Sequence, residues 1–329
     1  MAFFKHNASA PRPPEAAAEA PPAVPPASLP EPPPLSPDGL RDFWLHSDYV
    51  LGAVRELSEF GVKVLEGIGL ILEESLIAPQ DLGTAVRAGD VVVEKGSRIH
   101  PRMVPMLSGM GFSYVLVRPN PRVLVIALTP EAISASYLVA AIAKEAGADS
   151  YRIDNDYRTA DQTVAGIFEQ LVRADLVVTV GGLGEAGLDI RKAAGALGPN
   201  DFTPVAITPG SEHGFALLEG GIPLLALPAD TYPVFILGKL LLEPVIAKLM
   251  ATSTDLGLAS AYLAQPLRVK PRILTAVPAT VEATRLKISG LPTGLAGLHT
   301  IYQANALAIL TSDDDLVGEE SEVVYLPLT

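Results

Sequence analysis

The sequence predicts an α/β protein with a three-layer domain, a parallel sheet covered by helices on both faces, between an N-terminal α+β region and a small C-terminal β domain. Three observations predict this architecture. Apolar strand-like segments alternate with helix-length segments from Val123 to Met250, which is typical of βαβ units. Short β-like segments with turns between them follow Leu256. The first 40 residues are rich in proline and offer little to a core.

These changes in composition divide the chain into four regions. We expect a disordered proline-rich tail at 1–40, a truncated N-terminal helical and β region at 41–121, the α/β domain at 122–252 and the β domain at 253–329. Twelve of the 30 prolines lie between Pro11 and Pro37. The tail either docks on a proline-recognising partner or serves as a solubilising linker.

The sequence of the N-terminal region predicts two helices before its first strand. Apolar residues at intervals of three and four indicate a helix from Arg41 to Phe60. The apolar run from Val62 to Leu82 suits a second helix that ends near Pro79. We expect the remaining elements to be a strand and turn at 89–96, a short helix at 100–110 and a strand at 114–117.

The α/β domain reads as a regular alternation. The predicted strands are 123–128, 150–153, 176–180, 205–208 and 223–227, and the predicted helices are 130–146, 160–173, 188–197 and 231–250. The last helix is apolar on more than one face, and a surplus apolar face predicts a partner surface. We therefore expect a homodimer. The later strands are 272–277, 283–288, 306–311 and 323–328.

The overall composition excludes several functions. With 24 basic and 37 acidic residues, the formal charge of −13 disfavours nucleic acid and anionic membranes. The chain has no cysteine, which excludes disulfides, thiolate metal sites and thiol nucleophiles. No signal peptide or spanning helix is evident, so we expect a cytoplasmic protein.

A glycine-rich loop follows the predicted strand 176–180. Gly182-Leu-Gly184-Glu-Ala-Gly187 fits the dinucleotide pattern G-x-G-x-x-G, but no acidic residue ends the next predicted strand, where a ribose hydroxyl would need an acceptor. The alternatives are a simple strand-to-helix turn or a loop that holds another anion at a helix N-terminus. His213 lacks a nucleophile elbow and is interpreted as a loop histidine. The aspartates at 313–315 are interpreted as a solvated turn.

Six motifs occur in a fixed order along the chain: Thr129-Pro130-Glu131, Ala174-Asp175-Leu-Val-Val-Thr-Val-Gly181-Gly182, Gly187-Leu-Asp189, Thr208-Pro209-Gly210, Leu227-Pro228-Ala-Asp230 and Tyr302-Gln-Ala-Asn305. Together they resemble those of the MoeA/gephyrin E-domain family, which inserts molybdate into adenylylated molybdopterin. The resemblance covers about residues 62–329. The resemblance implies the same three-part architecture.

The chain also departs from the family pattern. Most of the N-terminal subdomain that family members carry after the position of Gly83 is absent. The serine and first aspartate of the family's glycine-rich loop are missing from Gly182-Leu-Gly184-Glu-Ala-Gly187. Ser211 stands where the family has a lysine, with Glu212 beside it.

The resemblance implies both a site and a function. Asp189 and Asp230 would be catalytic, and Glu131 would join them in holding Mg²⁺. Gly181, Gly182, Gly184, Pro209, Gly210 and Ser211 would line the molybdopterin site. We expect either molybdate insertion, impaired by the degenerate motifs, or a non-catalytic gephyrin-like scaffold. A scaffold would bind its partner through the proline-rich tail or through the groove between the last two domains.

Overall fold

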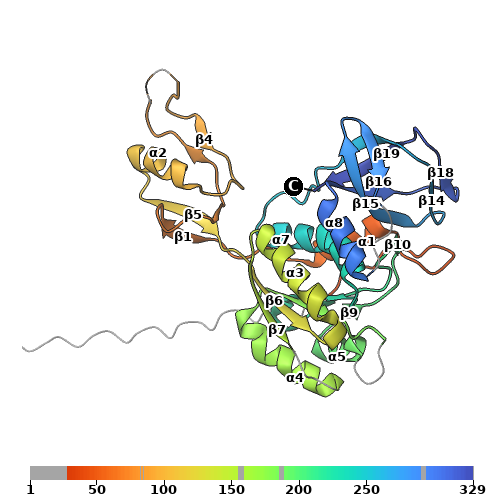
Figure 1. The fold of residues 1–329 in the computed structure, drawn as a ribbon. Helices are drawn as coiled ribbons and strands as arrows, with labels where there is room; N and C mark the ends of the chain where they lie inside the picture. The colour runs from red at the N-terminus through yellow and green to blue at the C-terminus, as the bar shows by residue number, and fades with distance from the viewer. Residues whose placement is uncertain are drawn as a thin grey trace, which may run out of the picture.

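The chain folds into a main body and a small lobe that stands apart from it. The computed structural model describes residues 28–81, 83, 85–154, 159–184, 189–289 and 294–328. Figure 1 shows the lobe, in orange and yellow, joined to the body by the segments that lead into β1 and out of β5. No helix within these described residues is long and apolar enough to cross a membrane.

A six-stranded sheet forms the centre of the main body, as the α/β prediction requires. Its strand order is β7-β6-β8-β12-β11-β9. The first four strands in this order run parallel, and β11 and β9 add an antiparallel edge. The strands are β6 (Arg122–Ala127), β7 (Asp149–Asp154), β8 (Leu176–Val180), β9 (Asn200–Asp201), β11 (Gly214–Leu217) and β12 (Pro223–Leu227).

Helices cover both faces of this sheet, which confirms the predicted three layers. Alternate residues of each parallel strand face opposite cores: Val123 and Val125 join one cluster, and Leu124 and Ile126 join the other. The first core packs under α1, α3, α6 and α7, and the second under α4 and α5. These helices are α1 (Phe43–Ala53), α3 (Ile133–Glu145), α4 (Ala160–Gln170), α5 (Ile190–Leu197), α6 (Thr231–Leu237) and α7 (Glu243–Leu249).

The segment predicted as a strand at 205–208 does not join the central sheet. Its strand, β10 (Ile207–Thr208), pairs in parallel with β15 of the C-terminal domain, with Ile207 opposite Leu274. The residues before it also pair with the N-terminal segment, because Arg41 N–H donates to the Pro204 carbonyl and the Arg41 carbonyl accepts from Ala206 N–H. A β-propensity run does not specify which sheet it joins.

The C-terminal domain is a second six-stranded sheet with one helix. Its order is β10-β15-β16-β13-β19-β17, and β15 also pairs with β17. The helix α8 (Gly294–Gln303) lies in a stretch from which only turns were expected. Besides β10, the strands of this sheet are β13 (Ala259–Leu263), β15 (Leu274–Glu282), β16 (Arg285–Ile288), β17 (Ala306–Leu310) and β19 (Glu322–Pro327). A separate two-stranded sheet consists of β14 (Leu267–Arg268) and β18 (Leu316–Val317).

The small lobe is β-rich, and the helix predicted at 62–82 is wrong. Gly69 adopts a left-handed backbone (φ 87°), which interrupts any helix there. Ile71, Leu72 and Leu76 are buried instead in short strands. The helix predicted at 100–110 is present as α2 (Val104–Gly109) with a single turn before it. The strands are β1 (Phe60–Lys63), β2 (Ile71–Leu72), β3 (Leu76–Ile77), β4 (Val91–Val93) and β5 (Tyr114–Arg118).

The apolar helix predicted at 231–250 is present, but it contains a π-helical segment. Residues Gly238–Leu242 form a π turn between α6 and α7. Leu237, Leu240 and Leu242 are fully buried within this single chain. The chain itself therefore covers the surplus apolar face, so this helix no longer argues for a homodimer, which stays a prediction.

Candidate functional site at the carboxyl ends of the parallel strands

The strand order places a topological switch point between β6 and β8. The chain leaves β6 for β7 on one side and then crosses to β8 on the other. Ligands of open α/β sheets bind beyond the carboxyl ends of the strands at such a point. The loops that leave β6 and β8 are those of Thr129 and Gly181, two segments singled out by the sequence motifs.

These two loops lie in direct contact. Gly181 has φ 85°, and a Cβ at this position would lie 3.0 Å from Thr129 Oγ1 and 3.1 Å from Ala132 Cβ. A glycine is therefore needed both for the backbone and for the space. The Thr129 hydroxyl is buried and has no hydrogen-bond partner among the described residues. This hydroxyl lies behind the Gly181 backbone, so the packing of the two loops at the switch point leaves no room for a side chain at Gly181.

The glycine-rich loop continues with more left-handed backbone. Gly182 and Gly184 have φ 73° and 80°, and Ile190 N–H donates to the Gly182 carbonyl at 3.0 Å. Successive glycines let the backbone approach an anion closely at the start of α5. Gly187, the last glycine of the motif, lies outside the described residues.

The predicted catalytic aspartates are both helix N-caps. Asp189 Oδ1 accepts from Arg191 N–H at 3.0 Å, at the start of α5. Asp230 Oδ1 accepts from Tyr232 N–H at 3.3 Å, at the start of α6. Each carboxylate therefore has a structural role at a helix N-terminus, which uses one of its two oxygens.

The structure does not assemble the predicted magnesium ligands into a metal site. Glu131 is exposed in the single turn before α3. Within the part of the chain that the structure describes, no group of three or more His, Asp or Glu side chains is arranged to hold a metal ion. Mg²⁺ binding by Glu131, Asp189 and Asp230 stays a prediction.

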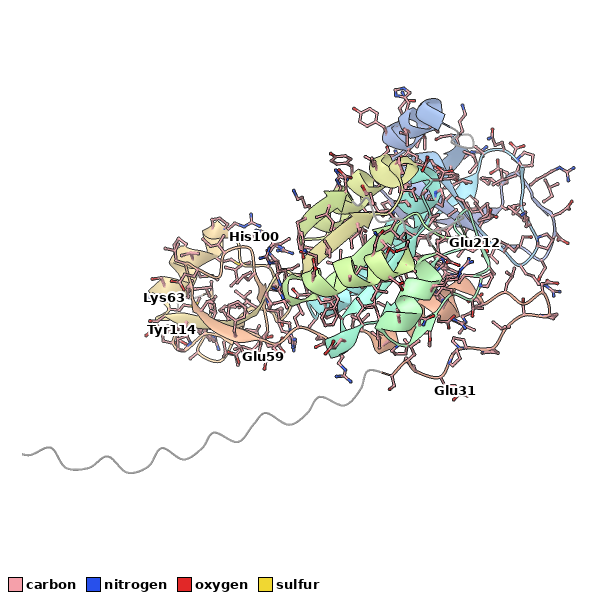
Figure 2. The ribbon with its side chains drawn as sticks, turned by 90° about the horizontal axis from the view of Figure 1, so that it is seen from below. Glu31, Glu59, Lys63, His100, Tyr114 and Glu212 are labelled. Atoms are coloured by element: carbon pink, nitrogen blue, oxygen red, sulfur yellow. The ribbon has the colours of Figure 1, made fainter. Side chains whose placement is uncertain are left out.

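The loop after β10 brings Pro209, Gly210 and Ser211 toward the start of α5. Gly210 has φ 106°, and a Cβ there would lie 3.2 Å from the Leu237 side chain of α6. Val205 N–H donates to the Ser211 carbonyl at 3.0 Å. The next side chain, Glu212, lies 3.6 Å from the Arg191 guanidinium. Figure 2 shows Glu212 on the main body, far from the lobe that carries His100.

Arg191 is a candidate site residue that the sequence motifs do not reveal. It lies in the first turn of α5, close to Gly184 and half-exposed beside Glu212. A cation is unfavourable at a helix N-terminus, and that mismatch is the signal in the sequence that marks this arginine. Its guanidinium is a cation close to the Pro209–Ser211 loop, paired at 3.6 Å with Glu212, whose side chain is exposed.

A buried pair of histidines lies directly behind the same loop. His46 and His213 are 1% and 2% exposed, and their Nε2 atoms are 3.1 Å apart. Burial, aided by His213 and Arg41, lowers the pKa of His46 to about 3. Burial lowers the pKa of His213 to about 4. Sequence reasoning could not pair them, because 167 residues separate them.

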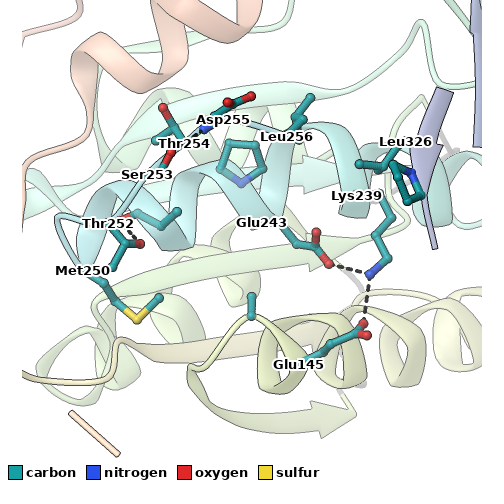
Figure 3. Close-up of a pocket in the computed structure, with 14 residues that line it drawn as sticks. Glu145, Lys239, Glu243, Met250, Thr252, Ser253, Thr254, Asp255, Leu256 and Leu326 are labelled. Atoms are coloured by element: carbon teal, nitrogen blue, oxygen red, sulfur yellow. Dashed lines mark hydrogen bonds and ion pairs between the residues drawn. The ribbon is translucent and has the colours of Figure 1, made fainter. Parts of the chain in front are cut away.

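A groove between the α/β and C-terminal domains also exists, at a different place. A cavity of about 330 Å³ lies between α7 and β19, lined by Lys239, Glu243, Asp255 and Leu326 among others. Figure 3 shows Lys239 held between Glu145 and Glu243, at 2.9 and 2.6 Å. This lysine is already neutralised, so the cavity is less suited to an anion than the strand-end loops.

Comparison with known proteins shows that the chain is similar to molybdopterin molybdenumtransferases. No family model matches the chain. It is 32% identical to molybdopterin molybdenumtransferase 1 of Mycobacterium tuberculosis over 182 residues, which is 50% of this chain and 42% of that protein. It is 26% identical to the molybdopterin molybdenumtransferase of Bacillus subtilis over 247 residues, 69% of this chain and 57% of that protein. The chain thus spans about half the length of the curated relatives it matches.

Solved structures give the same result for the fold. A molybdopterin biosynthesis MoeA protein from Pyrococcus horikoshii superposes with a TM-score of 0.70 at 15% identity, covering 86% of this chain and 98% of that chain. A molybdenum cofactor biosynthesis protein from Pyrococcus furiosus gives 0.67 at 18% identity, covering 87% and 99%. The resemblance to MoeA proteins inferred from the motifs is confirmed in sequence and in fold.

Proposed function

We propose that this chain, which shares its fold and part of its sequence with molybdopterin molybdenumtransferases, acts in molybdenum cofactor biosynthesis and binds adenylylated molybdopterin at its strand-end loops. One observation carries the proposal. Three features lie together at the edge formed by the carboxyl ends of the parallel strands: the glycine-rich loop after β8, the Pro209–Gly210 loop and the Arg191 guanidinium. That edge contains the switch point, where α/β sheets bind ligands.

The residues present suit an anionic ligand. Because the first-turn N–H groups of α5 already donate to Gly182 and Asp189, the backbone N–H groups of the left-handed Gly182 and Gly184 are the donors that this loop could offer to phosphate oxygens. The Arg191 guanidinium can form charge-assisted hydrogen bonds with the same groups once it exchanges Glu212 for the ligand.

Magnesium has a place in this proposal only together with the substrate. The three predicted carboxylates do not form a metal site within the described residues, and two of them cap helices. Mg²⁺ is commonly held by one or two carboxylates plus substrate phosphates. The second oxygens of Asp189 and Asp230 are the ligands this chain could add. No step of the reaction is assigned to the metal.

Calorimetric titration with adenylylated molybdopterin tests the proposal. The wild type should bind, and Arg191→Ala should bind ten- to a hundredfold more weakly, because a hydrogen bond to a charged group contributes about 1.5–3 kcal/mol. Arg268→Ala is the matched control, since Arg268 forms another exposed ion pair, with Asp315, in the C-terminal domain. Its affinity should equal that of the wild type.

Two results would contradict the proposal. The absence of heat at saturating ligand would exclude the pterin as the ligand. Equal losses in Arg191→Ala and Arg268→Ala would show that the ligand binds elsewhere or responds only to net charge. Molybdenum cofactor formed per hour, measured beside a full-length molybdopterin molybdenumtransferase, then distinguishes an active enzyme from a protein that only binds.

A further inference from the structure

A chain of buried polar contacts connects the N-terminal segment to the Pro209–Gly210 loop. The Arg41 guanidinium contacts Asp201 at 2.7 Å and His46 Nδ1 at 3.4 Å. His46 Nε2 lies 3.1 Å from His213 Nε2. His213 Nδ1 lies 2.8 Å from the Gly210 carbonyl oxygen. Arg41 is 3% exposed, so water does not substitute for these contacts.

The groups at the two ends of this series of hydrogen bonds determine which ring nitrogen of each histidine carries a hydrogen. The Gly210 carbonyl can only accept, so His213 carries its hydrogen on Nδ1. A neutral His213 then accepts at Nε2, so His46 carries its hydrogen on Nε2. His46 Nδ1 is left as an acceptor for the arginine, which can only donate. The two histidines are therefore neutral and in opposite tautomers.

An added proton would break this arrangement. It would set N–H against N–H between the rings, or against the Arg41 guanidinium. The low pKa values of both histidines, caused first by burial, agree with a neutral pair at physiological pH. The pair is thus a fixed support and not a switch near neutral pH.

The loop that these hydrogen bonds hold is the one whose Glu212 contacts Arg191. The Gly210 carbonyl points inward to His213, and the Ser211 carbonyl accepts from Val205 N–H. These two contacts place Glu212 within 3.6 Å of Arg191. The opposite side of the loop packs on Leu237.

We propose that Arg41, His46 and His213 are positioning residues that hold the Pro209–Glu212 loop in its ligand-binding geometry through this directional hydrogen-bond chain. The identity of the ligand rests on the function proposed above, whereas the support of the loop does not. The helix α1, which lies outside the sheet and contacts this loop through His46, thereby becomes part of the binding machinery.

Two measurements without ligand test the support directly. Nitrogen-15 NMR of the histidine rings should find hydrogen on Nε2 of His46 and on Nδ1 of His213 throughout pH 6–8. Amide exchange of Val205 should be at least tenfold faster in His213→Leu, relative to amides of β8, because its acceptor belongs to the released loop. The opposite tautomers, or unchanged Val205 exchange, would overturn the proposal.

Paired variants test the effect on binding. His213→Asn keeps a donor near the Nδ1 position and His46→Gln keeps one near Nε2, so both should bind adenylylated molybdopterin within about threefold of wild type. His213→Leu and His46→Leu should each bind adenylylated molybdopterin at least tenfold more weakly than the wild type. Thr163→Val, which removes a buried hydroxyl contact in α4, controls for a general loss of stability and should bind normally.

The outcomes separate this inference from the proposed function. If the wild type binds no pterin, the function fails, and the tautomers and Val205 exchange still decide the inference. If the wild type binds and the leucine variants bind equally well, the inference fails and the function stands. If the leucine variants do not fold, the wild-type tautomers and the asparagine and glutamine variants give the answer.

Discussion

Acidification should destabilise the protein through the His46–His213 pair. Burial lowers the pKa of these histidines to about 3 and about 4, whereas an unfolded histidine has a pKa near 6.5. As the pH falls below about 6.5, the two histidines bind protons in the unfolded state but stay neutral in the folded state. Stability is therefore lost from about pH 6.5 down toward pH 4, and the pair has no such effect at higher pH.

The expected magnitude follows from the same values. Between pH 7 and pH 5, each histidine that stays neutral in the folded state lowers the free energy of unfolding by about 2 kcal/mol, so the pair lowers it by about 4 kcal/mol. The double variant His46→Gln, His213→Asn has neither titrating group. The difference in unfolding free energy between wild type and variant should therefore change by about 4 kcal/mol over this interval.

Urea unfolding followed by the fluorescence of Trp44 measures this difference. Trp44 is the only tryptophan and belongs to α1, the helix that carries His46, so its fluorescence reports on the unfolding of that helix. His100→Gln removes an exposed histidine of the small lobe and should leave the pH dependence unchanged. Parallel stability curves for wild type and double variant from pH 7 to pH 5 would refute the reasoning.

Four further outcomes follow from the structure. Gly198→Ala should cost more than about 2 kcal/mol in urea unfolding, because its Cβ would lie 2.0 Å from the Leu217 carbonyl oxygen. Gly52→Ala should instead add about 0.5–1 kcal/mol, since this glycine lies in α1 with open space around it; a loss would contradict the open geometry. Ser211→Lys should tighten pterin binding in calorimetry by adding a cation beside Arg191, and weaker binding would place the ligand elsewhere. Light scattering should give twice the monomer mass of 34.5 kDa if the predicted homodimer forms, and a constant monomer mass would exclude it.

The sequence predicts the four parallel strands of the central sheet but not β9 and β11, because the central parallel strands are buried on both faces. Val123–Leu128 is continuously apolar and Leu176–Val180 is interrupted only by the buried Thr179, a pattern that few other structures allow. The same criterion fails in the small lobe. The run around Ile71 and Leu76 has helical length and apolar content, and only Gly69 and the burial of short strands distinguish it from a helix.

The candidate site was predictable in its loops but not in its chemistry. Gly181, Gly210 and Asp189 lie where the motifs place them, because glycine turns and helix caps are encoded locally. The contact of Arg191 with Glu212 depends on the pairing of β10 with β15, because this pairing positions the loop that carries Glu212. That pairing is a tertiary interaction, which the local sequence does not specify. The His46–His213 pair depends on the docking of α1, for which the local sequence carries no signal.

The pairing of β10 with β15 has a consequence for biosynthesis. Ile207 is made well before Leu274, the residue it faces, and domains generally fold in order as the chain emerges from the ribosome. The central sheet can close while β10 still lacks its neighbour. The loop that carries Gly210 and Ser211 therefore acquires its final anchor only when the C-terminal domain has been synthesised, so a nascent or prematurely ended chain would have the sheet without a finished ligand loop.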